Sequence, residues 1–493
     1  MPMFASARPI ALVALTLAGT AFFYPHAFGV SPRPAAPADA IDAAIARMGG
    51  DVTLRKIERV RFETMTLWQR LTFEDRLLDP VSAYELHSDL RNYTIGGWRN
   101  TRRFIGGPTL REMTDVVLDA AAVRRLPNPD GSMSPWAPLN IAYVDERKEL
   151  FAFAPERLLL AARAAADLRA LGDTTIGGVR HARVSATVSG YPATIFFRRT
   201  DGYLAMARLR AGQPNDFGLA PWGDMEVEMW YSRWNKYPLA GTPGVYYPTQ
   251  WDVRRVGRVY KRLTVLQASF DAAAPSDSFT ISDSLRAAYV ATASRSMWEF
   301  PMDSARVIEQ RFAMLGRPGQ AQMAVKVGTK WLFLEGAGVP SRAETDARWL
   351  ATADASGSPG GMLLTVSNSG RGGALWFAEK QLPVFVAPGS AAAMTATLPN
   401  WKLRPSVATV LARPQWVRLG GDSLWVEPID YPDFPGALVA YVPSLKWAYS
   451  GLAAAPINFD LLVERIRQRG WDVDRVGSLR GMVQPLPPRT ASR

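Results

Sequence analysis

The sequence lacks cysteine and has only three histidines, and each shortage excludes a class of site. Without cysteine the chain forms no disulfide, offers no thiol nucleophile and cannot carry the acylated cysteine of a lipoprotein anchor. The histidines are His26, His87 and His181, all in the first half of the chain. His87 and His181 stand in strand-like segments without a second ligand at metal-binding spacing. We therefore expect a solvated or hydrogen-bonded structural role for both.

Short catalytic motifs are absent as well. The sequence has no G-x-S-x-G elbow, no phosphate-binding loop of the Walker type and no dinucleotide fingerprint. The Gly-Arg-Gly-Gly turn at residues 370–373 lacks the spacing of a phosphate cradle, so its glycines are expected to shape a tight loop. We predict no catalytic residue and no cofactor.

Positive charge is in excess but dispersed. The formal net charge is +12 and the isoelectric point is near 9.9, yet the cations do not gather with aromatic residues on one element. The densest group, from Arg254 to Arg262, lies in an alternating stretch and is predicted to be the solvated face of a strand. We expect no nucleic-acid partner and leave peripheral contact with an anionic membrane surface open.

The N-terminus has the pattern of an export signal. Arg8 precedes a nearly continuous apolar run at residues 10–23, and small residues at 19–21 or 27–29 suit a cleavage site. A Pro/Ala-rich linker follows. We expect an exported protein that is periplasmic or associated with the envelope, with an uncleaved anchor as the alternative.

The two halves of the chain differ in hydrophobic period. Period-2 alternation begins at residues 59–64 and recurs along the first half, interrupted once by a helical pair at 140–151 and 155–171, which predicts an antiparallel sheet curved around a helix. From about Ala321, short strands alternate with helices, which predicts α/β layering. The predicted fold class is α+β. The predicted organisation is a signal peptide or anchor at 1–30, a linker at 31–38, an antiparallel half-barrel-like domain at 39–272, a bridging segment at 273–317, an α/β sandwich at 318–488 and a tail at 489–493.

One motif in the second half carries a family resemblance. Residues 362–365 read Met-Leu-Leu-Thr, residues 366–371 read Val-Ser-Asn-Ser-Gly-Arg, and Gly-Gly follows. This order resembles the metallo-β-lactamase superfamily, in which a buried strand ends in Thr before a His-x-His-x-Asp-His loop and a Gly-Gly turn. The resemblance implies a degenerate member, with 318–488 as the sandwich. It places these residues at former metal-ligand positions: Val366, Asn368, Gly370, Arg371, Asp433, Leu452 and Arg480.

The residues that replace the family's ligands determine which metal ion, if any, could bind. Zinc needs several imidazoles or carboxylates converging on it, and a half-chain without His or Cys has only oxygen ligands, which suit Mg or Ca. Glu427, Asp430 and Asp433 are candidate oxygen ligands that we expect to be ordinary loop acids. The two arginines near the former site would repel a cation. We therefore predict no metal, and an electropositive pocket able to accept an anionic small molecule.

The first half carries a second resemblance. Residues 155–162, 222–224, 230–232 and 247–248 are similar to a region related to the open half-barrels of lipoprotein-sorting and outer-membrane carrier proteins. Such a half-barrel typically has an apolar concave face able to hold an acyl chain. Five tryptophans either line that face or form plain core: Trp68, Trp98, Trp230, Trp234 and Trp251.

Three functional hypotheses follow. The leading one is a non-catalytic metallo-β-lactamase-fold protein that acts as a binding or interaction module in the cell envelope. The second is a hydrolase that is metal-independent or uses a carboxylate cluster around Asp430 and Asp433, which lacks a recognisable nucleophile–base pair. The third is a carrier of lipid or another apolar ligand in the half-barrel. The sequence names no specific partner.

Overall fold

The computed structural model describes residues 37–70, 81–105, 112–128, 130–215, 224–275, 277–294, 305–316, 322–366, 372–397, 408–432 and 434–487. The predicted export signal, most of the linker and the predicted tail lie outside these residues. No helix in the described part of the chain is long and apolar enough to cross a membrane.

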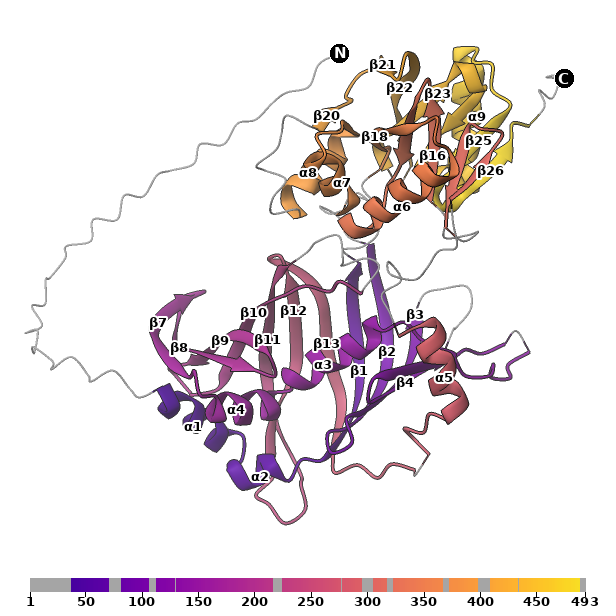
Figure 1. The fold of residues 1–493 in the computed structure, drawn as a ribbon. Coiled ribbons are helices and arrows are strands. Elements are labelled where there is room, and N and C mark those ends of the chain that lie inside the picture. The colour runs from indigo at the N-terminus through magenta and orange to yellow at the C-terminus, as the bar shows by residue number, and fades with distance from the viewer. Residues whose placement is uncertain are drawn as a thin grey trace, which may run out of the picture.

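The first domain is built on one antiparallel sheet, drawn from indigo to rose in Figure 1. Among the described residues its thirteen strands run in the order β6-β5-β4-β3-β2-β1-β13-β12-β11-β10-β9-β8-β7. The first strand in the chain, β1, therefore pairs with the last, β13, in the middle of the sheet. The predicted antiparallel curved sheet is confirmed. The strands are β1 (Arg59–Arg70), β2 (Val81–Asn92), β3 (Gly97–Ile105), β4 (Glu112–Leu118), β5 (Ala121–Arg125), β6 (Ala137–Pro138), β7 (Arg169–Ile176), β8 (Val179–Val188), β9 (Tyr191–Arg198), β10 (Leu204–Ala211), β11 (Met225–Tyr237), β12 (Val245–Arg255) and β13 (Arg258–Phe270).

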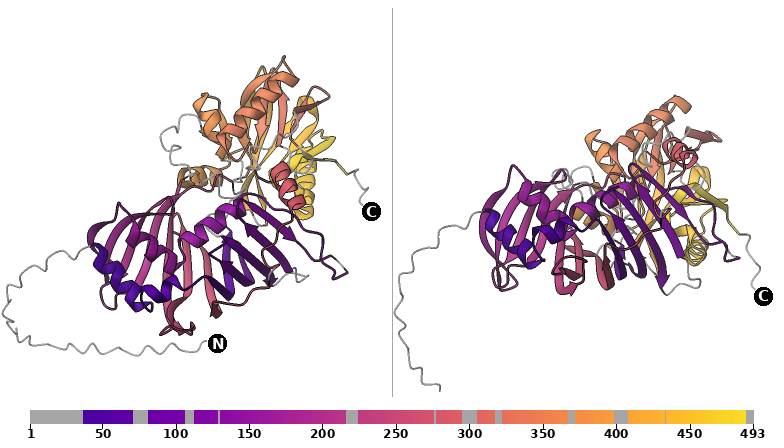
Figure 2. Two further views of the ribbon diagram at one scale, coloured as in Figure 1. Left: turned by 60° about the horizontal axis from the view of Figure 1, so that its bottom comes forward. Right: turned by 90° about the horizontal axis from the view of Figure 1, so that it is seen from below.

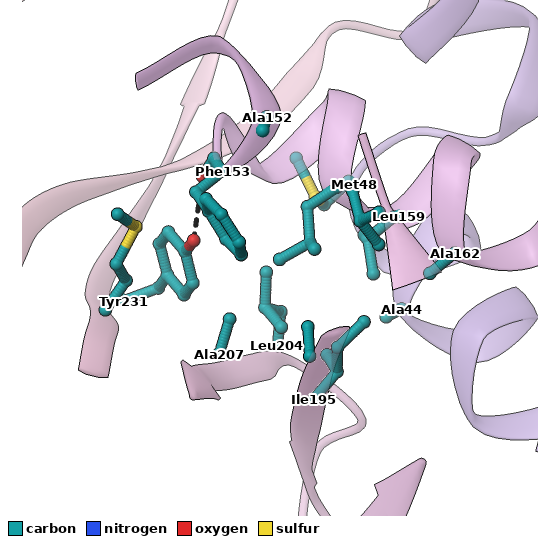
Figure 3. Packing of buried hydrophobic residues seen from close by; sticks show 14 of the residues in the cluster. Ala44, Met48, Ala152, Phe153, Leu159, Ala162, Ile195, Leu204, Ala207 and Tyr231 are labelled. Carbon is teal, nitrogen blue, oxygen red and sulfur yellow. Dashed lines mark hydrogen bonds between the residues drawn. The ribbon is translucent and has the colours of Figure 1, made fainter. Parts of the chain in front are cut away.

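Helices cover one face of this sheet. In Figures 1 and 2, α1 (Pro37–Arg47), α2 (Asp51–Arg55), α3 (Ala142–Ala152) and α4 (Pro155–Ala164) follow each other along it. Figure 3 shows the packing beneath α1 and α4, where Leu159 and Ala162 meet Ile195 and Leu204 of the sheet. The apolar positions of both helices recur at helical spacing, so one stripe of each is buried.

Helix α4 is shorter than the predicted helix at 155–171. It ends at Ala164, and β7 begins at Arg169. Between them the Asp167 carboxylate accepts hydrogen bonds from the backbone N–H of Thr187 at 2.9 Å and from its hydroxyl at 2.7 Å. These bonds tie the segment to β8, and the tertiary contact overrides the helical propensity of the alanines.

The second domain consists of two sheets between helices. Its described strands form one sheet of seven, β14 to β20 in chain order, and one of six, β21 to β26. The strands are β14 (Ala305–Ile308), β15 (Phe312–Leu315), β16 (Gln322–Val327), β17 (Lys330–Leu334), β18 (Ser358–Leu364), β19 (Val384–Val386), β20 (Ala408–Val410), β21 (Gln415–Leu419), β22 (Asp422–Tyr431), β23 (Phe434–Val442), β24 (Trp447–Tyr449), β25 (Arg475–Ser478) and β26 (Met482–Pro485). The helices are α6 (Pro340–Ala353), α7 (Ala374–Glu379), α8 (Pro388–Thr397), α9 (Pro456–Arg469) and the 3₁₀ turns η4 (Pro443–Leu445), η5 (Gly451–Ala454) and η6 (Leu479–Gly481).

Strand alternation produces the layers of this domain. In β17, Leu332 and Leu334 point into the core shared with β22 and β23, whereas Trp331 and Phe333 pack in the cluster that contains α6 and α7. A third cluster lies under α9. The result is an α/β/β/α sandwich, which is the predicted architecture.

The predicted bridging segment, 273–317, contains parts of both domains. Helix α5 (Asp283–Thr292) packs on β5 and β6 of the first domain. The β14–β15 hairpin pairs with β16, opposing Ala313 to Ala324, and buries Ala313 and Leu315. The second sheet therefore begins at Ala305, before the predicted boundary at 318, because the hairpin extends its edge.

Candidate functional site

Two of the predicted vestigial metal-ligand positions, Val366 and Leu452, are apolar and packed. Val366 is fully buried in the cluster under α9 with Ile429 and Tyr431, and Leu452 packs against the same cluster. Arg480 lies in η6 with its side chain outside the described residues. The remaining predicted positions lie outside the described residues: Asn368, Gly370, Arg371 and Asp433.

Hydrogen bonds close the junction beside Val366. The backbone N–H of Thr365 donates to Glu335 Oε1 at 3.0 Å, and the Thr365 hydroxyl donates to the same oxygen. The Gly451 N–H donates to the Thr365 hydroxyl at 2.8 Å. A Cβ at Gly451 would lie 2.8 Å from Glu335 Oε1 and 3.0 Å from Val366 Cγ2, so a larger residue would have to displace the Glu335 carboxylate. The ends of β17 and β18 and turn η5 thus form a packed junction.

These residues do not fit a zinc ion. Zinc would need lone pairs converging on an open point, whereas Val366 and Leu452 supply none and the Glu335 carboxylate is engaged by Thr365. In the described part of the chain, no group of three or more His, Asp or Glu side chains is placed to hold a metal ion.

The two described candidate oxygen ligands serve the fold. Glu427 is fully buried in β22 rather than in a loop, and it accepts hydrogen bonds from Trp425 at 2.9 Å, Arg465 at 3.0 Å and Arg469 at 3.1 Å. The arginines belong to α9, so Glu427 anchors that helix. Asp430 is exposed and accepts the backbone N–H of Gly436 at 2.7 Å, which closes the β22–β23 turn.

The first domain contains a cavity of about 160 Å³ between the sheet and α3. Strands β1, β2, β3, β12 and β13 contribute one wall, and α3 contributes the other. Its lining combines aromatic and aliphatic side chains with the following polar and charged ones: Thr66, Glu85, His87, Asp89, Asn100, Arg102, Tyr143, Glu146, Glu149, Gln213, Arg255 and Lys261.

Ion pairs between α3 and the sheet form the roof of the cavity. Glu146 and Glu149 are three residues apart and so share one face of α3. Glu149 accepts hydrogen bonds from Arg255 and Gln213, each at 2.6 Å, and Glu146 accepts one from Lys261 at 2.5 Å. Burial opposes the charge on Lys261 and Glu146, but their mutual attraction outweighs it. The pKa of Lys261 is raised and the pKa of Glu146 is lowered.

A second polar group lies on β2 and β3. The Glu85 carboxylate is 2.9 Å from Nε2 of His87, and Nδ1 of His87 is 3.2 Å from Oδ1 of Asn100. Burial alone would raise the pKa of Glu85, but His87, Arg102 and Lys261 together lower it. On the neighbouring strand Arg102 binds Asp115 at 2.8 Å. The cavity thus has charged groups on its floor and on its roof.

The sequence did not predict this cavity, although three of its lining residues alternate along one strand. Glu85, His87 and Asp89 alternate along β2, and period-2 geometry puts all three on one face. His87 therefore has a carboxylate two residues away, contrary to the expectation of an isolated histidine. The predicted solvated face from Arg254 to Arg262 is also wrong in part, because Arg255 and Lys261 turn inward to the acids of α3.

Three of the five tryptophans predicted for the concave face line the cavity, and the other two and His181 do not. Trp68, Trp98 and Trp251 line the cavity, whereas Trp230 and Trp234 do not. Trp230 stands opposite Asp252 in the register and so lies on the other face from Trp251. Trp234 stacks on the ring of Tyr203, with centroids 4.7 Å apart. His181 is buried with Nδ1 2.8 Å from the carbonyl oxygen of Val179, as a structural histidine would be.

Comparison with known proteins gives likeness of fold only. No family model and no curated protein matches the chain. Solved structures similar to it include a metallo-β-lactamase from Pontibacter korlensis, at 14% identity over 37% of this chain and 93% of that chain with a TM-score of 0.30. The mono-zinc metallo-β-lactamase FIM-1 from Pseudomonas aeruginosa matches at 13% identity over 37% and 89%, with a TM-score of 0.29.

A longer neighbour is the sec-alkylsulfatase Pisa1 from Pseudomonas sp., at 9% identity over 37% of this chain and 39% of that one, with a TM-score of 0.31. By its own layers, the second domain is an α/β/β/α sandwich. The likeness carries no conclusion about activity. The similarity of the first domain to lipoprotein-sorting proteins stays a prediction.

Proposed function

We propose that this chain is an exported, non-catalytic binding protein whose ligand site is the cavity of the first domain. The observation that carries the proposal is the cavity lining, in which charged and hydrogen-bonding side chains converge with aromatic ones on a pocket of about 160 Å³. An apolar pocket with convergent polar groups is the usual form of a small-molecule site. The metallo-β-lactamase-like domain then serves as a scaffold or interaction module.

The packing around Val366 supports the non-catalytic part of the proposal. A metal-activated hydroxide needs an open coordination position, and this position is occupied by a buried valine beside the Glu335–Thr365–Gly451 hydrogen bonds. The anionic ligand predicted for the former metal pocket depends on Arg371 and Arg480, whose side chains lie outside the described residues. That ligand stays a prediction.

The charged side chains in the cavity lining weigh against the lipid-carrier alternative. An acyl chain would lie against Glu85, Arg102 and Lys261, and it would remove water from them without replacing its hydrogen bonds. Three aromatic side chains favour an apolar component of the ligand: Trp68, Trp251 and Tyr260. The mixture suits a small molecule that is polar on its edge and apolar on its face.

The proposal is tested on the full purified chain by metal analysis, a hydrolase assay and a thermal-shift screen of small polar compounds, with native mass spectrometry for retained lipid. We expect no stoichiometric metal, no hydrolysis, and stabilisation by at least one polar compound. The Glu85→Gln variant should lose that stabilisation, whereas the exposed Glu112→Gln variant on β4 should keep it. Retained lipid with no polar ligand would favour the carrier instead.

A further inference from the structure

The chemistry of the cavity narrows the class of its ligand, and this step rests on the proposed function. The first constraint is charge. Around the cavity and directly behind its lining, five carboxylates are matched in number by five arginine and lysine side chains. The carboxylates are Glu85, Asp89, Asp115, Glu146 and Glu149, and the cations are Arg91, Arg102, Arg124, Arg255 and Lys261.

Charge balance disfavours an ionic ligand. A carboxylate entering this space would lose its hydration and find Arg102, Arg255 and Lys261 already paired at short distance. An ammonium group would find Glu146 and Glu149 paired likewise. An uncompensated charge in a desolvated site is expensive. The arrangement therefore selects for a ligand without net charge.

The second constraint is hydrogen bonding. Three lining side chains have an atom without a hydrogen-bond partner among the described residues: Thr66 Oγ1, Glu85 Oε1 and Arg102 Nε. Thr66 and Glu85 are each 2% exposed, and Arg102 is 9% exposed. A carboxylate oxygen only accepts, a guanidinium nitrogen only donates, and a hydroxyl does both. Ligand hydroxyls can satisfy all three kinds of group, because each hydroxyl donates and accepts.

The third constraint is shape. Trp68 and Tyr260 meet edge to face with ring centroids 6.3 Å apart, and Trp251 lies on the adjoining strand. Flat aromatic surfaces suit a ring with apolar C–H faces and a polar edge. At about 10–15 Å³ per water molecule, the space holds on the order of ten waters, which is the size of one small ring with its substituents.

We infer that the cavity binds a neutral polyhydroxylated ring of the carbohydrate class. Its hydroxyls bond to the charged and polar side chains of β2, β3 and α3, and one ring face packs on the tryptophans. The ligand enters without changing the charge balance, so α3 keeps its ion pairs to Arg255 and Lys261.

Isothermal titration calorimetry on the full purified chain tests this inference. The neutral probes are glucose, galactose and mannose. Glucosamine and glucuronate carry the same ring with one added charge, and palmitate represents an apolar ligand. We expect at least one neutral hexose to bind, and its aminated and carboxylated derivatives to bind roughly tenfold more weakly or worse, because each adds an uncompensated charge.

Two tryptophans provide a matched pair of variants. Trp251 and Trp230 lie on neighbouring strands, on opposite faces, and each indole N–H donates one hydrogen bond, to the Pro248 carbonyl and to Glu228 respectively. Trp251→Phe should weaken hexose binding roughly three- to tenfold through lost contact area. Trp230→Phe should leave the affinity unchanged, although it removes a comparable hydrogen bond.

The outcomes separate this inference from the proposed function. Tighter binding of glucosamine or glucuronate than of any neutral hexose overturns the inference and leaves a polar binding protein. Equal effects of the two tryptophan variants would place the ligand elsewhere. Binding of palmitate alone, or of no probe and no compound in the polar screen, overturns the proposed function as well.

Discussion

Buried polar groups lie in different surroundings in the two domains. In the first, α3 meets the sheet through ion pairs, and charged side chains surround a cavity. In the second, the predicted vestigial metal-ligand positions Val366 and Leu452 pack in an apolar cluster, and the polar groups beside them, Glu335 and Thr365, bond to each other. Buried charge is costly and persists where it is paired or has a use.

This difference bears on where to look for function. The resemblance found in the sequence directs attention to the ends of β17 and β18, yet the described residues there form core. A cavity lined by paired charges lies in the other domain, in a sheet for which the sequence predicted an apolar concave face. A proposal about function is therefore better based on the charged groups that line the cavity than on the name of the fold.

The largest expected effect comes from breaking an α3 ion pair. Glu149→Leu leaves the buried Arg255 without its carboxylate and should lower the free energy of unfolding by about 3–5 kcal/mol, measured by urea denaturation. The double variant Glu149→Leu/Arg255→Leu should recover much of that loss, because neither charge is then stranded. A loss of under 1 kcal/mol in the single variant would mean that α3 is held mainly by its apolar contacts.

The stabilities of the two domains should depend on pH with opposite sign. In the second domain, burial raises the pKa of Asp346 from 3.8 to about 7, although Arg342 lies 2.8 Å away and opposes the shift. Because the unfolded state releases this proton first, stability falls as pH rises from about 4 to 7, by roughly 2–4 kcal/mol. Asp346→Asn should remove this slope from the urea denaturation of the second domain.

In the first domain the same measurement should give the reverse slope. The pKa values of Glu85 and Glu146 are lowered below 4.5, so the stability they contribute is present above that pH and is lost as pH falls below it. The Glu146 side chain is 40% accessible, so we expect Glu85, which is buried, to contribute more. Equal slopes in both domains would contradict the contrast drawn between them.

A histidine placed at one of the predicted vestigial ligand positions of the second domain should not create a metal site. Val366→His puts an imidazole into the apolar cluster under α9 and should cost about 1–3 kcal/mol of unfolding free energy. Calorimetric titration with zinc should detect no stoichiometric binding. Stoichiometric zinc binding would show that the position is still open to a metal, and the matched Val366→Ala variant reports the cost of losing the valine alone.

Much of the fold could be predicted from the sequence, because alternation in the first half and the alternating strands and helices of the second determine which faces are buried. Boundaries were harder. The end of α4 depends on the bonds of Asp167 to Thr187, and the β14–β15 hairpin joins the second sheet through partners that follow it in the chain. Such tertiary contacts have no local sequence pattern.

The cavity was harder to predict for a different reason. A stretch such as the one containing Arg255 and Lys261 has the same alternation whether its charged face meets solvent or a helix. What turns that face inward is the pair of acids on α3, more than a hundred residues earlier in the chain. The alternating Glu85, His87 and Asp89 put three ionisable residues on one face of β2. However, Arg59, Arg61 and Glu63 alternate in the same way on β1 outside the cavity, so the pattern alone does not predict a site.

The smallest expected effect concerns the hydrogen bond that joins the sheet to the segment between α3 and α4. The Tyr231 hydroxyl on β11 is buried and donates to the carbonyl oxygen of Phe153, 2.7 Å away, between the two helices (Figure 3). Tyr231→Phe removes the donor while the ring still fills its place, so unfolding free energy should fall by about 1 kcal/mol. Thermal denaturation measures the loss, and Tyr246→Phe, on a partly exposed ring, is the control. Because the carbonyl fixes the end of α3, the variant should also weaken hexose binding slightly, and unchanged affinity would mean that the ion pairs alone position the cavity roof.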